Sequence, residues 1–173
     1  MAASPKLTGA SVYIYSFLDM RPVEFGQAML DQLDLQLQTA LSASNATSKV
    51  LRFRDSQPGA SFAPRSEFPT YGITQSTDKI PIGETIASNF AAERAFRARY
   101  RLIVYPNYLF VSGPWRVYTI HWMLFDCATN NIVWSHNYNG RSLIWLTVSE
   151  SGATQARPVV KDLVAGLKAD GLL

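Results

Sequence analysis

Three apolar, aromatic-rich runs follow one another in the second half of the chain, separated by short turn-forming breaks. The runs cover residues 101–111, 115–126 and 131–139. The first two have apolar residues on both alternating faces, which is typical of strands covered on both sides. In the third, Trp134, His136 and Tyr138 alternate with polar residues, so one wet face and a place near a sheet edge are expected. The runs therefore predict three consecutive antiparallel strands, with a bulge or bend at Pro106.

The N-terminal half predicts a strand, a long amphipathic helix and a second strand. Residues 11–18 are rich in β-branched and aromatic side chains, which favours a strand. From 23 to 41, apolar residues recur every four positions and form one stripe along a helix. Residues 49–53 predict the second strand. A strand, helix, strand order of this length favours a βαβ unit with parallel pairing.

Residues 54–82 predict a long loop. Four prolines are interleaved there with Ser, Gly and Gln, so no regular element is expected. A loop of this length inside a compact domain is either functional or disordered. It also contains Phe62, Phe68 and Tyr71, and a purely solvated linker does not need aromatic side chains. A binding loop and a mobile loop remain equal alternatives.

Two further helices complete the predicted fold. One spans residues 83–99, with Ile82, Ile86 and Phe90 on its apolar stripe, and the other spans residues 156–169. The resulting order is β-α-β-loop-α-β-β-β-α. We predict a single α/β (α+β) domain over residues 1–173, with residues 1–10 flexible. Its core is one mixed sheet of four to six strands with three helices packed on it.

Composition narrows the class of protein. Only 17% of the 173 residues are charged, against roughly 25% in an average soluble domain, which suits a secreted or periplasmic protein. The net charge is +3, and its densest cluster, Arg94 to Arg101, is explained by a basic helix end. A binder of single-stranded nucleic acid is therefore an alternative that we do not favour. Cys127 is the single cysteine, so no internal disulfide forms, and no apolar run approaches the length of a membrane span.

The sequence carries no catalytic or phosphate-binding motif. His121 and His136 fall on neighbouring strands, but a metal site needs three or four ligands and a triad needs a nucleophile and a carboxylate. No cofactor, metal or catalytic residue is predicted. The aromatic residues exceed what packing needs, which favours a contact surface. Its candidate residues are Phe62, Phe68, Tyr71, Trp134, His136, Tyr138, Arg141 and Trp145. The alternative is an enzyme or small-molecule binder whose pocket uses His121, His136 and Arg141.

The order of elements and the hairpin IHWMLFDCATNNIVWSHNYNG resemble a group of small periplasmic domains. The group comprises the curli-export lipoprotein, the amino-terminal domain of TolB and the lipoprotein activators of penicillin-binding proteins. The resemblance implies a non-enzymatic protein associated with the outer membrane of a Gram-negative bacterium. Its partner would be another envelope protein or a second copy, and a lipidated cysteine would lie upstream. The first residues, MAASPKLTG, lack the features of a signal peptide. We expect that a signal has been removed; the alternative is a cytoplasmic protein.

Overall fold

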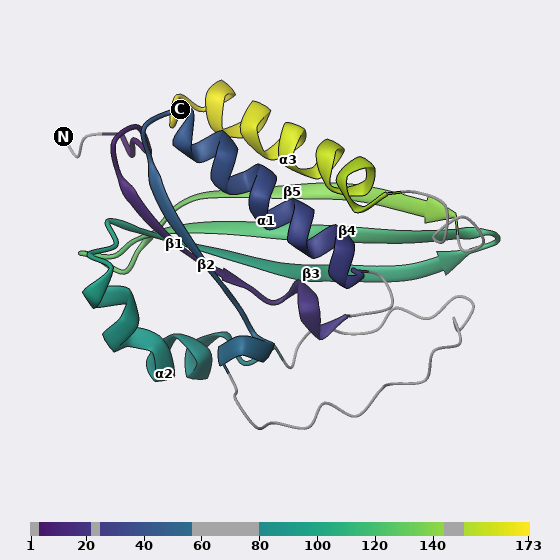
Figure 1. Ribbon diagram of the computed structural model, residues 1–173, viewed down its shortest axis with the longest axis horizontal. Coiled ribbons are helices and arrows are strands. Elements are labelled where there is room, and N and C mark those ends of the chain that lie inside the picture. Colours follow the sequence, from purple (N-terminus) through teal and green to yellow (C-terminus); the bar gives the residue numbers. More distant parts are fainter. Residues whose placement is uncertain (1–3, 22–24, 57–79, 144–150) are drawn as a thin grey trace.

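The computed structural model describes residues 4–21, 25–56, 80–143 and 151–173. Within them the predicted α+β fold is confirmed: one mixed five-stranded sheet carries three α-helices (Figure 1). The strands and helices follow the predicted order: β1 (Ser11–Ser16), α1 (Gln27–Ser42), β2 (Thr47–Arg52), α2 (Ile82–Ala95), β3 (Tyr100–Ser112), β4 (Trp115–Asp126), β5 (Ile132–Leu143) and α3 (Gly152–Ala169). Two short 3₁₀ helices, η1 (Leu18–Met20) and η2 (Arg54–Ser56), follow β1 and β2.

The strand order across the sheet is β2-β1-β3-β4-β5. β1 pairs in parallel with both β2 and β3, as the strand-helix-strand pattern predicted for the first pair. β3, β4 and β5 form an antiparallel meander, and among the described strands β5 lies at an edge of the sheet, as its wet face predicted. The pairing of β3 with β4 shifts register between Pro106 and Tyr108. This irregularity lies beyond Val104, the last β3 residue that pairs with β1, so the proline interrupts no ladder with β1.

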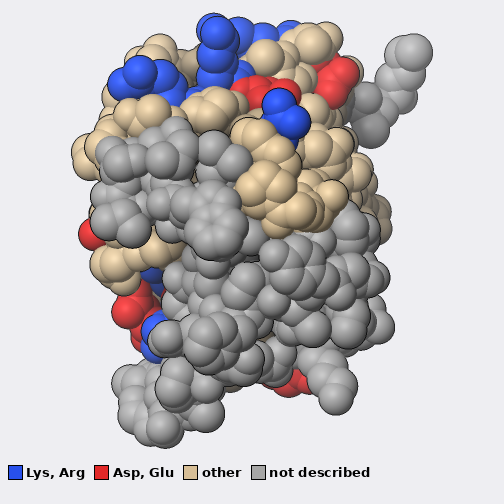
Figure 2. All heavy atoms as spheres, turned by 90° about the vertical axis from the view of Figure 1, so that its right-hand side faces the viewer, with Lys and Arg blue, Asp and Glu red and all other residues tan. Residues whose placement is uncertain are grey.

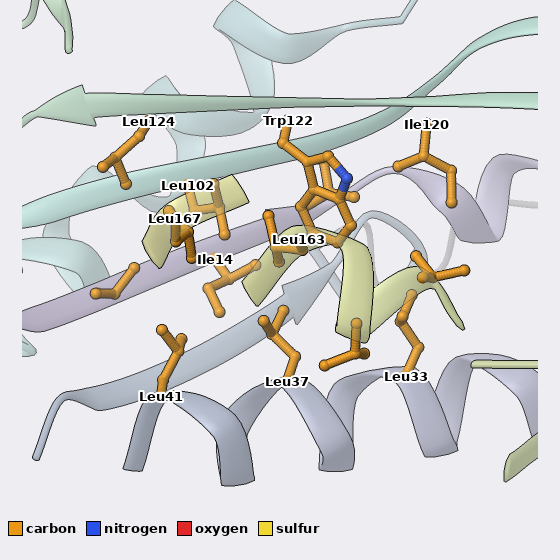
Figure 3. Packing of buried hydrophobic residues seen from close by; sticks show 14 of the residues in the cluster. Ile14, Leu33, Leu37, Leu41, Leu102, Ile120, Trp122, Leu124, Leu163 and Leu167 are labelled. Atoms are coloured by element: carbon orange, nitrogen blue, oxygen red, sulfur yellow. The ribbon is translucent and has the colours of Figure 1, made fainter. Parts of the chain in front are cut away.

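α1 and α3 lie side by side on one face of the sheet and enclose the main core (Figures 1 and 3). Figure 3 shows leucines of both helices meeting apolar residues that the strands contribute. Trp122 is the largest of the fully buried side chains in this core. The buried stripe of α1 consists of Met29, Leu30, Leu33, Leu37 and Leu41. The α1 stripe was predicted from its helical spacing.

α2 lies on the opposite face of the sheet, over a second and smaller core (Figure 1). Its buried residues are Tyr13, Tyr15, Phe17, Phe53 and Ile103. The prediction for α2 was wrong at Phe90, which is 47% exposed, whereas the buried residues of this helix are Thr85 and Glu93. The N-terminal stretch that we expected to be flexible includes Leu7, whose side chain is buried and whose N–H donates to the Leu172 carbonyl at 2.8 Å.

Candidate binding surface

The aromatic face of β5 is occupied by α3. Trp134 is only 8% exposed, and its indole Nε1–H donates to Asp170 Oδ2 at 2.7 Å. His136 stacks on Trp134, with ring centres 5.5 Å apart and an interplanar angle of 11°. The His136 Nε2 atom lies 2.7 Å from Asp162 Oδ2. These contacts attach α3 to β5, so the side chains that we predicted for partner contact are engaged within the chain.

Tyr138 belongs to the same face and packs at the margin of the main core. Its ring centre lies 6.3 Å from that of Tyr118, itself a buried residue. Burial, followed by the charge of Asp162, raises the pKa of the Tyr138 phenol. Tyr138 therefore remains a neutral hydrogen-bonding group at physiological pH.

Arg141 is the fourth of the predicted site residues that fall in β5. It lies on the opposite face of the strand from Trp134, His136 and Tyr138. Its guanidinium carbon is 4.6 Å from the centre of the Trp115 ring, a cation–π arrangement at the far end of β4. Arg141 is exposed. It therefore does not join Trp134, His136 and Tyr138 in one surface. The other predicted site residues, Phe62, Phe68, Tyr71 and Trp145, lie outside the described residues.

The face of β4 and β5 that points away from α3 carries a polar row, which we define as Thr119, His121, Asn137 and Asn139. The Thr119 hydroxyl donates to Asn139 Oδ1 at 2.9 Å, and His121 Nδ1 makes a short hydrogen bond with Asn137 Oδ1. The His121 ring also lies 5.1 Å from the Tyr105 ring on β3. Asn137 and Asn139 are exposed. The polar row thus offers amide and hydroxyl groups beside the last described strand of the sheet.

The pocket hypothesis that combined both histidines is wrong. His121 pairs with Asn137 and His136 pairs with Trp122 across β4 and β5, so the two imidazoles point to opposite faces of the sheet. A sheet cannot present both rings to one ligand. Among the described residues, no group of three His, Cys, Asp or Glu side chains is placed to hold a metal ion.

A buried ionic cluster under α2 was not anticipated. Glu93 and Arg101 are 3% and 5% exposed. Arg101 Nη2 donates to Glu93 Oε1 at 2.6 Å and Arg101 Nε donates to Oε2 at 2.8 Å. The Tyr15 hydroxyl donates to Oε2 at 2.8 Å, and Arg101 Nη1 donates to Asn130 Oδ1 at 2.9 Å. The cluster joins α2 to β1, β3 and the turn after β4.

The cluster sets the ionisation of its members. Burial raises the pKa of Glu93, but the hydrogen bonds from Arg101 and Tyr15, together with the charge of Arg101, outweigh this effect, so the pKa lies below its usual value. Burial and the hydrogen bond to Glu93 raise the pKa of Tyr15. Burial and the Glu93 charge raise the pKa of the Cys127 thiol to about 11. A protonated thiol is a poor nucleophile, so the geometry gives Cys127 no catalytic activation.

One signal in the sequence pointed to this cluster. Arg101 occupies the same strand face as Ile103 and Tyr105, on a strand that was predicted to be covered on both sides. A buried cation needs a carboxylate partner, and Glu93 is the acid closest to it in the preceding helix. We assigned the arginines from 94 to 101 together to a basic helix end, which concealed the separate position of Arg101.

Basic side chains are also found on the other side of the molecule. The exposed cations of α3 are Arg157, Lys161 and Lys168. Figure 2 shows Lys and Arg atoms along its upper edge, where the α1–α3 layer lies, with Asp and Glu atoms among them. This mixed distribution differs from the broad basic stripe that nucleic-acid binders present. Within the part of the chain that the structure describes, no helix is long and apolar enough to cross a membrane.

Comparison with known proteins identifies the fold. No protein-family model and no curated protein matches the sequence. A point variant of the PelC dodecamer from Paraburkholderia phytofirmans is 12% identical, with a TM-score of 0.51 over 96% of this chain and 95% of that chain. The PelC dodecamer from the same organism is 11% identical, with a TM-score of 0.50 over 95% of this chain and 94% of that chain. Lipoprotein GNA1162 from Neisseria meningitidis is 13% identical, with a TM-score of 0.47 over 95% and 99% of the two chains. Because the identities are this low, the comparison shows that the chain and PelC have the same fold and nothing further.

Proposed function

We propose that this chain is a non-enzymatic protein of the bacterial cell envelope that acts through protein–protein contacts, including contacts between its own copies. The observation that carries the proposal is the edge strand β5, which has β4 as its one sheet neighbour among the described strands. Its face away from α3 exposes Ser135, Asn137 and Asn139. A strand at a sheet edge with hydrogen-bonding side chains beside it is a template for adding a strand from another chain.

The comparison supports self-association. The solved structures of PelC that share this fold are dodecamers. The envelope location is supported by the low charged fraction and by the resemblance to periplasmic lipoprotein domains that the sequence carries. The finer resemblance to the curli-export lipoprotein, to TolB and to the activators of penicillin-binding proteins belongs to the same proposal.

The proposal is tested by measuring the mass of the purified chain in solution. We expect light scattering after size-exclusion chromatography to show species larger than the monomer. Ser135→Lys, which places a charge on the exposed face of β5, should shift the chain towards the monomer because edge lysines block strand addition. Ser42→Lys adds the same charge at an exposed position of α1 and should not change the mass. A chain that stays monomeric at all concentrations and captures no envelope protein would contradict the proposal.

A further inference from the structure

α2 presents Phe90 and several alanines to the solvent, while Ile82 and Ile86 pack against the second core. Phe90 is 47% exposed, and Ala87, Ala91 and Ala95 are exposed as well. The opposite side of the helix buries Thr85 and Glu93 against the sheet. An amphipathic helix on a protein surface normally turns its large apolar side chains towards the core, and Phe90 is the exception in α2. The exposed apolar side of α2 therefore needs an explanation.

The buried ion pair prevents α2 from turning this side inward. Both oxygens of Glu93 accept hydrogen bonds from Arg101, and Oε2 also accepts one from Tyr15. A rotation that buried Phe90 would pull Glu93 away from Arg101 and leave a buried charge without its partner. No other described α-helix lies on this face of the sheet to cover α2 (Figure 1). The side chains of the exposed side are thus held outward by the fold.

We define the α2 outer face as Glu84, Ala87, Phe90, Ala91 and Arg94. All five residues are exposed. The guanidinium carbon of Arg94 lies 5.8 Å from the centre of the Phe90 ring, so the cation and the ring form one continuous patch. The positions 84, 87, 91 and 94 follow the spacing of three, four and three residues that lines up side chains along a helix–helix seam. Alanines in such a seam allow two helices to approach closely.

The α2 outer face is complementary to itself. Glu84 and Arg94 lie five positions on either side of Asn89, and Ala87 and Ala91 lie two positions on either side. In an antiparallel pair of two α2 helices, Glu84 of each copy therefore faces Arg94 of the other, and Ala87 faces Ala91. A parallel pair would place like charges opposite each other. Antiparallel helix dipoles add to the preference.

We propose that α2 is a homotypic docking surface, at which a second copy of this chain binds through antiparallel α2–α2 packing about a two-fold axis. The arrangement is an isologous contact, in which each surface residue meets its symmetry-related complement. An acid at one end of the face and a base at the other favour this occupant over an anionic membrane, which would select cations alone. In this dimer, Phe90 of each copy lies beside the two-fold axis and is shielded from water.

The contact has a limited size. Two helices of 14 residues meet over a length of about 21 Å. Such a contact falls below the roughly 1,600 Å² of a standard interface, so by itself it is a weak association. A second surface at β5 would strengthen it by multivalency. In this sense the inference rests on the proposed self-association and names one of its surfaces.

A charge swap tests the pairing. Sedimentation velocity over a concentration series measures the association of the full chain, and circular dichroism verifies that each variant is folded. Glu84→Arg and Arg94→Glu each place like charges opposite each other twice per dimer, so each should weaken the association by about tenfold. The double variant Glu84→Arg/Arg94→Glu restores opposite charges and should associate like the original chain. A mixture of the two single variants should associate more tightly than either variant alone.

Arg157→Glu, a charge reversal on the exposed side of α3, is the matched control and should leave the association unchanged. The inference is overturned if the single variants associate normally, if the double variant is not restored, or if the original chain is monomeric throughout. The two proposals are separable. Loss of association with Ser135→Lys, together with normal association of the α2 variants, would leave the proposed function standing and would remove the α2 contact.

Discussion

Arg101 and Glu93 form a two-point ion pair inside the protein, with donor–acceptor distances of 2.6 and 2.8 Å. The pair connects the start of β3 to the last turn of α2, and each member has a further hydrogen-bonding partner in Tyr15 or Asn130. Taking two charges out of water is favourable only when the geometry is this complete. α2 is therefore attached to the sheet by this buried ion pair as well as by the packing of Ile82 and Ile86, and the outward position of Phe90 follows from that attachment.

Removal of one partner of this pair should be strongly destabilising. Arg101→Met leaves the Glu93 carboxylate buried without its cation, and we expect a loss of about 3 kcal/mol in the free energy of unfolding. The double variant Glu93→Leu/Arg101→Met removes both charges and should recover most of the loss. Denaturant titration measures both. Arg99→Met, which breaks the pair between Asp126 and the half-exposed Arg99, is the control and should change stability by about 1 kcal/mol or less. If Arg101→Met and Arg99→Met lowered the free energy of unfolding equally, this account of the buried pair would be contradicted.

The same pair predicts a dependence on pH. The pKa of Glu93 in the folded chain lies below its ordinary value of 4.5. Its contribution to stability is therefore fully present above the unfolded pKa and is lost as pH falls through the folded pKa. Glu93→Gln lacks this contribution at every pH. The difference in unfolding free energy between the original chain and Glu93→Gln should be largest at about pH 7 and shrink towards about pH 3. A difference that grows on acidification would show that the pKa is shifted in the other direction.

Cys127 should react slowly with alkylating reagents at neutral pH. Burial and the nearby Glu93 carboxylate raise the pKa of its thiol to about 11, and the thiolate is the reactive form. The rate of reaction with iodoacetamide should keep rising with pH up to about 11. Glu93→Gln removes the nearby negative charge and should move the rate profile to lower pH, provided that the variant is folded. A profile with its midpoint near that of an ordinary thiol would contradict the assignment.

The sequence was sufficient to predict the order of elements, the parallel β1–β2 pair, the antiparallel meander of β3 to β5 and a place for β5 near a sheet edge, because hydrophobic periodicity reports which sides of an element are covered. It did not predict that β3 pairs in parallel with β1. The sequence was not sufficient to predict which residues form the contact surface. Alternation separated the two faces of β5 correctly, but the choice of Trp134, His136 and Tyr138 required knowing that α3 lies over them. The predicted stripe of α2 was correct for Ile82 and Ile86, which pack against the second core, and failed at Phe90 for a similar reason, since Phe90 is apolar and Glu93 is charged. Only the partner Arg101 on β3 explains why Glu93 is buried beside these isoleucines.

The contact between α1 and α3 depends on a glycine at the start of α3. A Cβ atom added at Gly152 would overlap the Ala28 carbonyl group and lie 2.8 Å from the Met29 nitrogen. These are backbone atoms of α1, which cannot move aside as a flexible side chain would. Gly152→Ala must therefore push the two helices apart, and we expect it to lower the free energy of unfolding by about 2 kcal/mol or more.

Gly83, at the second position of α2, is the matched control. A Cβ atom added there meets no atom within 4 Å. Gly83→Ala should raise the free energy of unfolding by up to about 1 kcal/mol, because alanine is the better helix former. Thermal unfolding followed by circular dichroism compares the two variants directly. If Gly152→Ala were as stable as Gly83→Ala, the close approach of the first turns of α1 and α3 would not exist in solution.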